Sequence, residues 1–419
     1  MIDFDKWQEI LTSLAQHKLR TALTAFGVFW GIFMLTVLLG AGTGLRNGVM
    51  DGFPASPNNV FIWSGSTTQL PYKGLPIGRR VTLKPEDVAA IKRDVPSVRE
   101  VYGQNSIGVW SGTPPYTVHK NNSGTFFVQG SHAGMAPINS VTVTQGRYLN
   151  EIDDRDKRKV AVIGARAKEQ LFDAGDPVIG ANIRIAGINF QVVGTFDSQQ
   201  RGNNSQDEEK IHIPNDTLRH AFNQSGWIGS FVIQPKPGIH ASVAEQEVKK
   251  YLYQRKDVHP DDVGVLGSFN LQVEYDKIQG LFTGIKFFSW LVAVGTITAG
   301  AIGVGNIMLI VVKERTREIG VRKALGATPA SIVSMIVQES VLITAVAGYF
   351  GLVVGVFLLA GVANVLEMTG GADMFARPSV DFTTALIAVL VLIVSGVLAS
   401  LLPAAKAAAV NPIVALQDE

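Results

Sequence analysis

The sequence predicts an α-helical integral membrane protein with four transmembrane helices and a large mixed α+β domain inserted between helices 1 and 2. Its composition is 47% hydrophobic and only 17% charged, and its mean hydropathy of +0.21 is higher than soluble domains usually show. Four segments each hold the roughly 20 apolar residues that a bilayer core requires. Residues 44–280, between the first two of these segments, have the composition of a soluble domain.

The chain begins with an amphipathic pattern over residues 1–20. Its apolar residues recur at helical spacing and are Phe4, Trp7, Leu11 and Leu14. We expect a cytoplasmic amphipathic helix that lies on the inner face of the membrane. Transmembrane helix 1 follows at 21–43. It is longer than the apolar region of a signal peptide and no A-x-A cleavage site follows it, so we expect an uncleaved anchor.

Residues 44–280 alternate short strands with helical patches. The run 182–193 alternates in polarity around Ala186-Gly187, which predicts a β-hairpin. The acidic and Gly/Asn-rich stretch 198–210 is predicted to be a polar, mobile loop. The other predicted elements are strands at 59–63, 125–129 and 141–144, a helix that begins at Pro85, and a helix at 242–255.

The three remaining spans are grouped near the C-terminus. In helix 2, Gly295, Ala299 and Gly303 recur four residues apart, a pattern of close helix contacts either within one chain or between two chains. The predicted segments are helix 2 with a stalk (281–312), a cytoplasmic coupling loop (313–330), helix 3 (331–366), a short external loop (367–381), helix 4 (382–403) and a cytoplasmic tail (404–419).

Glu339 falls inside the third apolar segment, where an acid at the bilayer centre would cost about 3 kcal/mol. A span that starts near Val341 avoids this cost and leaves Glu339 at the cytoplasmic boundary. We therefore expect a salt bridge from Glu339 to the basic residues of 313–330, and we favour it over a proton-relay role.

Basic residues in the short connections predict the orientation. Arg377 is the single basic residue between the third and fourth spans. Lys18 and Arg20 precede the first span, and Lys406 follows the fourth. The basic residues that follow the second span are Lys313, Arg315, Arg317, Arg322 and Lys323. Both termini are therefore predicted to be cytoplasmic, and residues 44–280 to be extracytoplasmic.

Several function classes lack the residues that they need. A net charge of +2, with basic residues beside apolar segments, argues against a nucleic-acid partner. The absence of cysteine excludes disulfides and thiolate sites. The phosphate-binding pattern G-x-x-x-x-G-K-[ST] does not occur, and the histidines lack metal-ligand spacing. We predict no catalytic residue and no metal site, and we interpret the acidic clusters 153–154, 207–209 and 261–262 as solvated surface.

Two adjacent stretches carry a specific signature, namely the apolar, glycine-containing run 303–313 and the sequence ERTREIGVRKALGA at 314–327. Together they closely resemble the signature of the MacB-like, FtsX-related permeases of ATP-binding-cassette (ABC) systems. Residues 146–153 and 159–164 resemble parts of the MacB-like periplasmic domain, and 402–416 resembles the ending of the family. One departure is that the best-known exporter carries its ATPase fused ahead of the permease, whereas 20 residues precede the first span here.

The densely charged segment 313–330 is predicted to dock an ATPase. Ile319, Val321 and Leu325 add an apolar face to its charges, and its glycines suit backbone turns or helix ends. A loop that only marks topology needs no acids, glycines or apolar stripe, so we favour docking over that alternative. The candidate coupling residues are Glu314, Arg315, Thr316, Arg317, Glu318, Ile319, Gly320, Arg322, Lys323 and Gly326.

The resemblance implies a non-catalytic permease subunit of an ABC-type export system in the bacterial inner membrane. A separate cytoplasmic ABC ATPase would bind ATP and Mg, and its hydrolysis cycle would move the extracytoplasmic domain and drive efflux of a substrate from the periplasmic side. The resemblance also implies a dimer with itself or a similar permease, and it leaves open a periplasmic adaptor protein. The alternatives are an FtsX-like regulator that transmits force to an extracytoplasmic enzyme, a lipoprotein-release permease, and a ligand sensor without ATP coupling.

Overall fold

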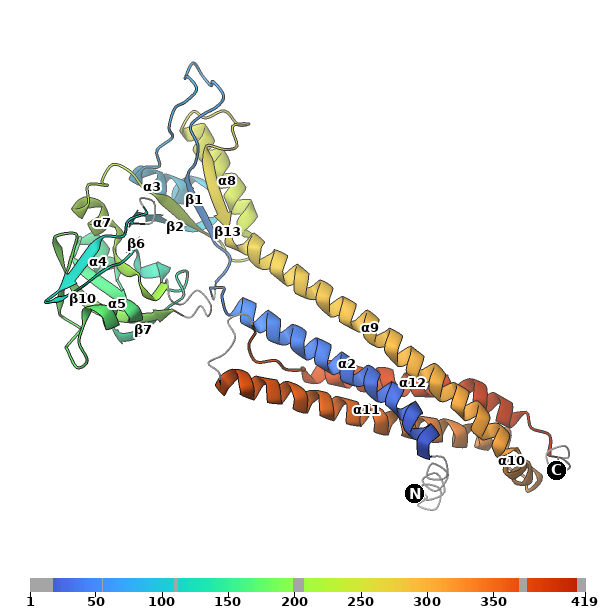
Figure 1. The fold of residues 1–419 in the computed structure, drawn as a ribbon. Helices are drawn as coiled ribbons and strands as arrows, with labels where there is room; N and C mark the ends of the chain where they lie inside the picture. Colours follow the sequence, from blue (N-terminus) through green and yellow to red (C-terminus); the bar gives the residue numbers. More distant parts are fainter. Residues whose placement is uncertain (1–17, 55, 109–111, 199–206, 369–374, 413–419) are drawn as a thin grey trace. The chain divides into compact units, whose positions relative to one another are not determined.

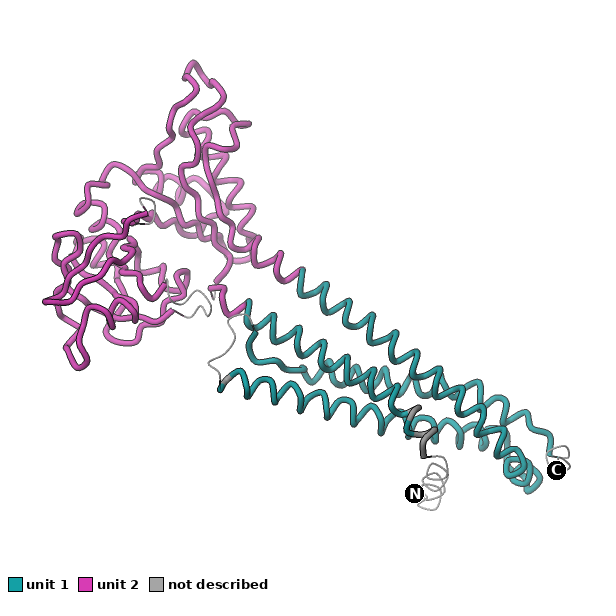
Figure 2. The backbone as a smooth tube through the Cα atoms, viewed as in Figure 1, with its two compact units in different colours: residues 1–49, 281–419 teal, residues 50–280 magenta. Residues whose placement is uncertain are grey.

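The computed structural model describes residues 18–54, 56–108, 112–198, 207–368 and 375–412. The chain divides into two compact units, one of residues 1–49 and 281–419 and the other of residues 50–280 (Figure 2). The predicted amphipathic helix lies outside the described residues except for its last three. Most of the predicted polar loop 198–210 also lies outside them.

The first unit is helical (Figure 1). Four of its helices are long and apolar enough to cross a membrane, which confirms this part of the predicted fold class. A fifth, short helix joins two of them. These helices are α2 (Lys18–Met50), α9 (Leu271–Glu314), α10 (Thr316–Ala324), α11 (Pro329–Met368) and α12 (Phe382–Ala408).

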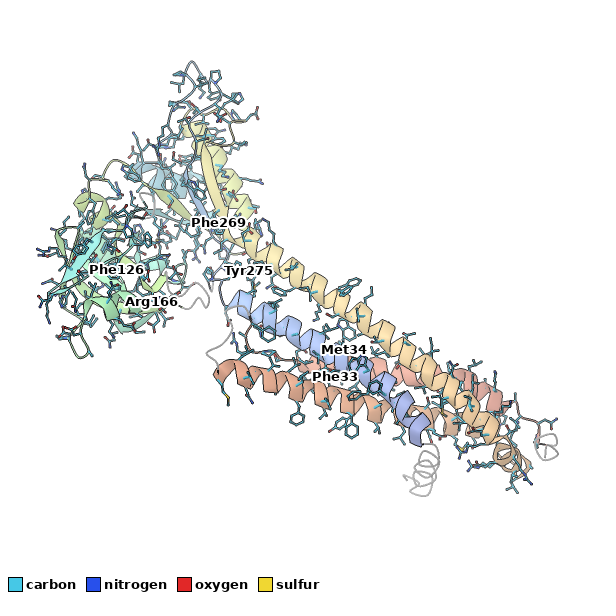
Figure 3. All side chains as sticks on the ribbon, in the orientation of Figure 1. Phe33, Met34, Phe126, Arg166, Phe269 and Tyr275 are labelled. Carbon is cyan, nitrogen blue, oxygen red and sulfur yellow. The ribbon has the colours of Figure 1, made fainter. Side chains whose placement is uncertain are left out.

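One apolar core joins all five helices of this unit. Val28 of α2, Val304 of α9, Ile319 of α10, Ile336 of α11 and Ala404 of α12 are buried in it. Aromatic residues of α2 stack along the helix, and the Phe29 and Phe33 rings lie 5.8 Å apart. Phe33 is labelled in Figure 3. The short helix α10 is therefore packed into the bundle.

Two glycines of α9 allow close helix approach. A Cβ atom at Gly300 would lie 3.1 Å from the backbone nitrogen of Val28, where α2 crosses α9. A Cβ atom at Gly305 would lie 2.8 Å from the carbonyl oxygen of Ala399 in α12. Any larger residue would push these backbones apart.

The predicted stripe of small residues behaves differently. Gly295 and Gly303 have open space where a Cβ would be, and Ala299 is exposed. In the described chain the stripe makes no close contact with another helix. The four-residue spacing thus identifies a face of small residues on α9, but the close contacts with other helices of the chain are made by Gly300 and Gly305.

The second unit contains a four-stranded antiparallel sheet in the order β13-β1-β12-β2. Its strands are β1 (Val60–Ser64), β2 (Val98–Gln104), β12 (Ser230–Pro235) and β13 (Leu266–Asn270). Helices α3 (Pro85–Asp94) and α8 (Ala241–Arg255) pack on it, and Ile91 and Val248 are buried against Ile62 and Phe231 in a shared core. The predictions for 59–63, for a helix from Pro85 and for 242–255 are confirmed.

A nine-stranded mixed sheet forms the rest of this unit, in the order β3-β6-β11-β8-β10-β9-β4-β5 with β7 paired to β10. Phe126, labelled in Figure 3, is buried in its core. The strands are β3 (Ser106–Ile107), β4 (Tyr116–His119), β5 (Asn122–Thr125), β6 (Val128–Ser131), β7 (Val141–Gly146), β8 (Val160–Gly164), β9 (Asn182–Ile185), β10 (Ile188–Ser198) and β11 (Ile211–Pro214). The helices are η1 (Ala133–Met135), α4 (Glu151–Arg155), α5 (Ala165–Leu171) and α7 (Asn215–Ala221).

Two strand predictions had different outcomes. The hairpin at 182–193 is confirmed, because β9 and β10 pair across Ala186 and Gly187, whose φ angles of 44° and 89° suit a tight turn. The single strand predicted at 125–129 is wrong. The chain leaves β5 at Thr125 and enters β6 at Val128, and of the two residues between them Phe126 is buried in the core whereas Phe127 is partly exposed.

The solvated-surface interpretation of the acidic clusters is wrong at five positions. Asp153 and Asp262 are buried, and the side chains of Asp154, Asp207 and Glu208 are largely buried. Asp262 accepts hydrogen bonds from the backbone N–H groups of Gln69 and Leu70. Asp262 is thus held by residues 193 and 192 positions earlier, which local polarity could not reveal, whereas the partners of Asp153 lie within six residues of it.

Asp153 stabilises the start of α4. It accepts two hydrogen bonds from Arg147, at 2.6 and 3.0 Å, and one from the N–H of Asn150. Burial alone would raise the pKa of the Asp153 carboxyl, but these hydrogen bonds outweigh it and hold the pKa below its usual range. Its contribution to stability is therefore present above about pH 4 and is lost as the pH falls through the folded pKa.

We expect Asp153→Ala to lower the free energy of unfolding by about 2 kcal/mol, because it removes a buried carboxylate that accepts hydrogen bonds from Arg147 and from the Asn150 N–H. Glu151→Ala, in the same turn but exposed, should change it by less than about 0.5 kcal/mol. Thermal unfolding of the purified chain at neutral and acidic pH measures both. The difference between the variants should shrink at acidic pH, and equal stability at neutral pH would contradict the assigned role.

Gly305→Ala should also destabilise the protein, since overlap with the Ala399 carbonyl costs about 1 to 3 kcal/mol. This cost matches or exceeds the roughly 1 kcal/mol that alanine gains over glycine in a helix. Gly303→Ala is the matched control and should be neutral or stabilising. Melting temperatures in nanodiscs test the pair, and a stabilised Gly305→Ala variant would show that α9 and α12 are not in contact there.

Candidate coupling site

The segment predicted as a coupling loop is mostly helical. A single residue, Arg315, separates the end of α9 from the start of α10. The Thr316 hydroxyl donates to the carbonyls of Val312 and Lys313, and the Ile319 N–H donates to the Arg315 carbonyl. These bonds leave little freedom at the joint, so α10 is held at the end of α9.

The second end of the segment forms a tight turn. Gly326 has a φ of +98°, which glycine adopts readily, and it follows the end of α10 as predicted. The Ser331 N–H donates to the Thr328 hydroxyl at the start of α11. The expectation of a turn or helix end at Gly320 is wrong, because Gly320 lies inside α10 and is buried.

An ion network fixes α10 to α11. The Arg315 guanidinium contacts Glu318 at 2.9 Å and Glu339 of α11 at 3.3 Å. Glu318 also contacts Arg322 at 3.0 Å. The Glu339 side chain is 4% exposed, so Arg315 compensates a buried charge, and the salt bridge predicted for Glu339 is confirmed.

Lys323 fixes α10 to α12. Its ammonium donates to the carbonyls of Ala408 and Val410, at 2.8 and 2.7 Å. The last carbonyls of a helix lack intrahelical partners and carry negative partial charge, so a lysine there satisfies them. The sequence indicated only that Lys323 is basic, and nothing in its local pattern pointed to the end of α12, which lies 85 residues away in the chain.

The candidate coupling residues therefore differ in their exposure. Ile319 and Gly320 are buried, so they are not exposed to a partner. Arg317 is exposed, and so are Val321 (42%) and Leu325 (84%). A further group is partly exposed and holds the segment on its neighbours, namely Arg315, Glu318, Arg322 and Lys323. Glu314 and Gly326 are exposed, and Thr316 is half-buried.

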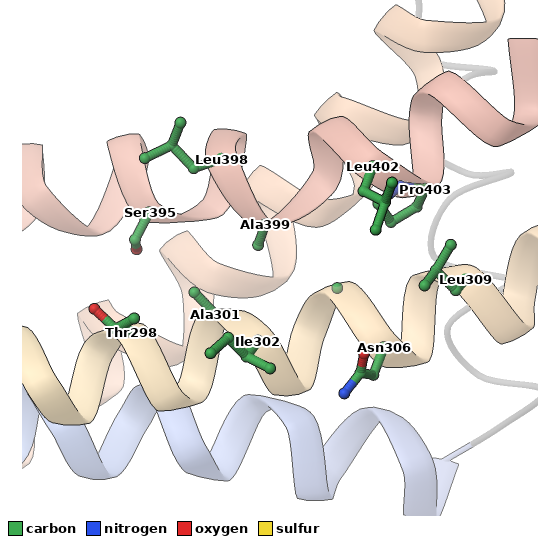
Figure 4. Close-up of a pocket in the computed structure, with 11 residues that line it drawn as sticks. Thr298, Ala301, Ile302, Asn306, Leu309, Ser395, Leu398, Ala399, Leu402 and Pro403 are labelled. Carbon is green, nitrogen blue, oxygen red and sulfur yellow. The ribbon is translucent and has the colours of Figure 1, made fainter.

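A groove of about 340 Å³ lies between α9 and α12 (Figure 4). It is lined mainly by apolar atoms, with Thr298 and Ala301 on one helix and Ser395 and Ala399 on the other. Pro403 lies inside α12 and has no N–H, so the Ala399 carbonyl loses its usual helical partner. Among the residues that the structure describes, no group of three or more His, Asp or Glu could hold a metal ion.

The buried Glu339 gives a direct test of the ion network. We expect Glu339→Gln to weaken the attachment of α10 and to speed tryptic cleavage after Arg322 at least about tenfold, which corresponds to about 1.4 kcal/mol of local opening. Gln338→Ala, at the exposed neighbouring position, is the control and should leave cleavage unchanged. Equal cleavage rates in the two variants would show that the pair does not hold α10.

Comparison with known proteins places the two units in known families. Residues 21–251 match the MacB-like periplasmic core domain, and residues 290–412 match the FtsX-like permease C-terminal domain. The periplasmic region of MacB from Actinobacillus actinomycetemcomitans aligns with 55% of this chain and 95% of its own, with 19% identity and a TM-score of 0.42.

Full-length relatives are ATP-binding/permease proteins. The pyoverdine export protein PvdT of Pseudomonas fluorescens is 30% identical over 407 residues, which are 96% of this chain and 58% of the relative. The macrolide export protein MacB of Bdellovibrio bacteriovorus is 26% identical over 410 residues, which are 97% of this chain and 60% of the relative. Permeases of this type are generally non-catalytic and work with ABC ATPases. The chain therefore belongs to the MacB-like, FtsX-related family of ABC transporter permeases, and it is a multi-pass protein of the inner membrane.

Proposed function

We propose that this chain is the permease subunit of an ABC export system, in which an ATPase docks on α10 and drives motion of residues 50–280 on the periplasmic side. The observation that carries the proposal is an exposed apolar and cationic surface on an anchored helix, made by Arg317, Val321 and Leu325. An exposed leucine beside a charge is the kind of anchor that a groove on a partner accepts. Relatives are named as exporters with ATP-binding regions, which agrees with this function.

Orientation supports the placement of this surface on the cytoplasmic side. Basic residues gather on both sides of the joint between α9 and α10 and in the last turn of α10. Under the positive-inside rule that end of the bundle faces the cytoplasm, where ATP is available. Residues 50–280, which follow α2 and precede most of α9, then lie outside the cytoplasm.

The attachments of α10 indicate where a docking force would go. Arg315 links it to α11 and Lys323 links it to α12, while the chain itself links it to α9. An ATPase that moves α10 would therefore move three membrane helices together. α9 runs without interruption from residue 271, inside the second unit, to Glu314, so it offers a continuous connection to residues 50–280.

A second copy of this chain, or a similar permease, would complete the transporter. The unpacked face of α9, with Gly295, Ala299 and Gly303, is our candidate for that contact, because small residues allow close approach of helices in a membrane. ATP and Mg belong to the ATPase in this proposal, since the sequence contains no phosphate-binding pattern of the G-x-x-x-x-G-K-[ST] type. The substrate would be moved on the periplasmic side.

We expect Leu325→Asp to weaken ATPase binding by at least about tenfold, because truncation of an interface anchor costs about 2 kcal/mol. Arg317→Glu should act in the same direction. Val263→Asp, at a 79% exposed position of the other unit, is the matched control and should bind normally. The measurement is a titration in nanodiscs with the ATP-hydrolysing protein that co-purifies with the tagged chain. If no such protein co-purifies, or Leu325→Asp binds it as wild type does, the docking proposal is wrong.

A further inference from the structure

His132 lies where the two sheets of the second unit meet. It follows β6 of the nine-stranded sheet and precedes η1. Its Nδ1 atom is 2.6 Å from Oδ2 of Asp154 in α4, and its Nε2 atom is 2.8 Å from the carbonyl oxygen of Gly103 in β2 of the four-stranded sheet. The side chain is 23% exposed. One imidazole ring thus connects both sheets.

The geometry requires a charged ring. A neutral imidazole has one N–H donor and one acceptor nitrogen, whereas both partners of His132 are oxygen acceptors. The Gly103 carbonyl can only accept, and the short contact to Asp154 is typical of a charge-assisted bond. Loss of the proton would leave a nitrogen lone pair facing an oxygen atom, so one of the two bonds would be lost.

The surrounding charges favour the protonated state. Asp154 and Asp216 of α7 are the acids that face His132, and the Tyr102 ring of β2 lies 5.6 Å away. Oδ1 of Asp154 is buried and has no hydrogen-bond partner in the described part of the chain, so His132 is the main compensation for this carboxylate. Burial lowers the pKa of His132, but Asp154, the Gly103 carbonyl and Asp216 raise it more, so the pKa lies above its ordinary value.

The neighbouring buried groups do not titrate in the same range. The His212 ring, which is buried, has its pKa lowered to about 3 by burial and by Lys210. Burial raises the pKa of Tyr148, which contacts His212 Nδ1 through its hydroxyl at 2.9 Å, to about 12. His212 is therefore a neutral acceptor over the physiological range.

Uncharged groups make further contacts across this boundary. The N–H and side-chain amide of Asn105, just after β2, bond to Asn215 and Gln224 on the other side. Met135 and Ile138 pack against Val232 of β12 in an apolar cluster. These contacts do not depend on the charge of His132.

We propose that His132 is a proton-dependent latch between the two sheets of this domain, closed when the ring is protonated. Because the folded pKa is raised, the latch is fully present below the unfolded pKa of about 6.5 and is lost as the pH rises through the folded pKa. A domain on the periplasmic side meets the external pH directly. The latch would make the domain stiffer in acid and more mobile in alkali, independently of whether an ATPase docks on α10.

Spin labels test this in the full chain. The sequence has no cysteine, so Glu169→Cys in α5 and Lys250→Cys in α8 introduce the only labelling sites, both exposed and on different sheets. Pulsed electron spin resonance in nanodiscs should give a narrow distance distribution at about pH 5.5 and a broader one at about pH 9. His132→Gln should be broad at both pH values.

His240→Gln is the matched control, because His240 forms an exposed pair with Asp276 at 2.8 Å in the same unit. It should respond to pH as the parent does. Asp154→Asn should keep the distribution narrow at both pH values, since an amide N–H at position 154 can donate to a neutral ring that still donates to the Gly103 carbonyl. A distribution in the parent that does not change between about pH 5.5 and 9 would overturn the latch without any variant. So would a His132→Gln protein that still responds as the parent does.

Discussion

The membrane unit is organised around one buried carboxylate. Glu339 lies on an otherwise apolar helix, and a buried charge without a partner costs several kcal/mol. Arg315 supplies the partner only if α10 stays at the end of α11, so the electrostatic requirement of a single residue fixes the position of the whole segment. The same arginine bonds to Glu318, which in turn holds Arg322. An apolar residue at position 339 would leave α10 attached through its chain ends, through Ile319 and through the bonds of Lys323 to the end of α12.

This constraint separates the residues that build the coupling site from those that can meet a partner. Removal of one member of a buried ion pair costs about 3 to 5 kcal/mol, whereas an exposed pair contributes about 0 to 1 kcal/mol. Charges at Arg315 and Glu339 are therefore architectural, and their loss would disturb docking only indirectly. Arg317, Val321 and Leu325 extend from the fixed helix and carry little of its stability. A helix that is rigid at its base and apolar at its surface can transmit a displacement instead of absorbing it.

Sequence patterns predicted the features that local physics determines. Apolar runs gave the four long helices, Ala186-Gly187 gave the hairpin, and the cost of an acid in hydrocarbon predicted the Glu339 salt bridge. The errors occurred where contacts with residues far along the chain determine whether a residue is buried. Asp262 is buried because Gln69 and Leu70, almost 200 residues earlier, donate to it. Spacing found a small-residue face on α9, yet only the packed structure shows that Gly300 and Gly305 make the close intrachain contacts.

Histidines of the periplasmic-type domain show the same dependence on partners. His132 and His212 are both largely buried and lie on strands or turns of one sheet, but their surroundings favour a protonated ring at His132 and a neutral ring at His212. His212 faces a hydroxyl group that can donate, so the ring stays neutral at no cost. His132 faces two oxygen acceptors, so both of its ring nitrogens must carry a proton if both hydrogen bonds are to form. Burial alone would make both rings neutral, and the difference arises from which atoms the backbone of β2 and the start of α4 bring to the ring. In this protein, buried charges lie where two elements meet, namely α10 with α11 and β2 with α4. Loss of such a charge would loosen the contact between the two elements without unfolding either of them.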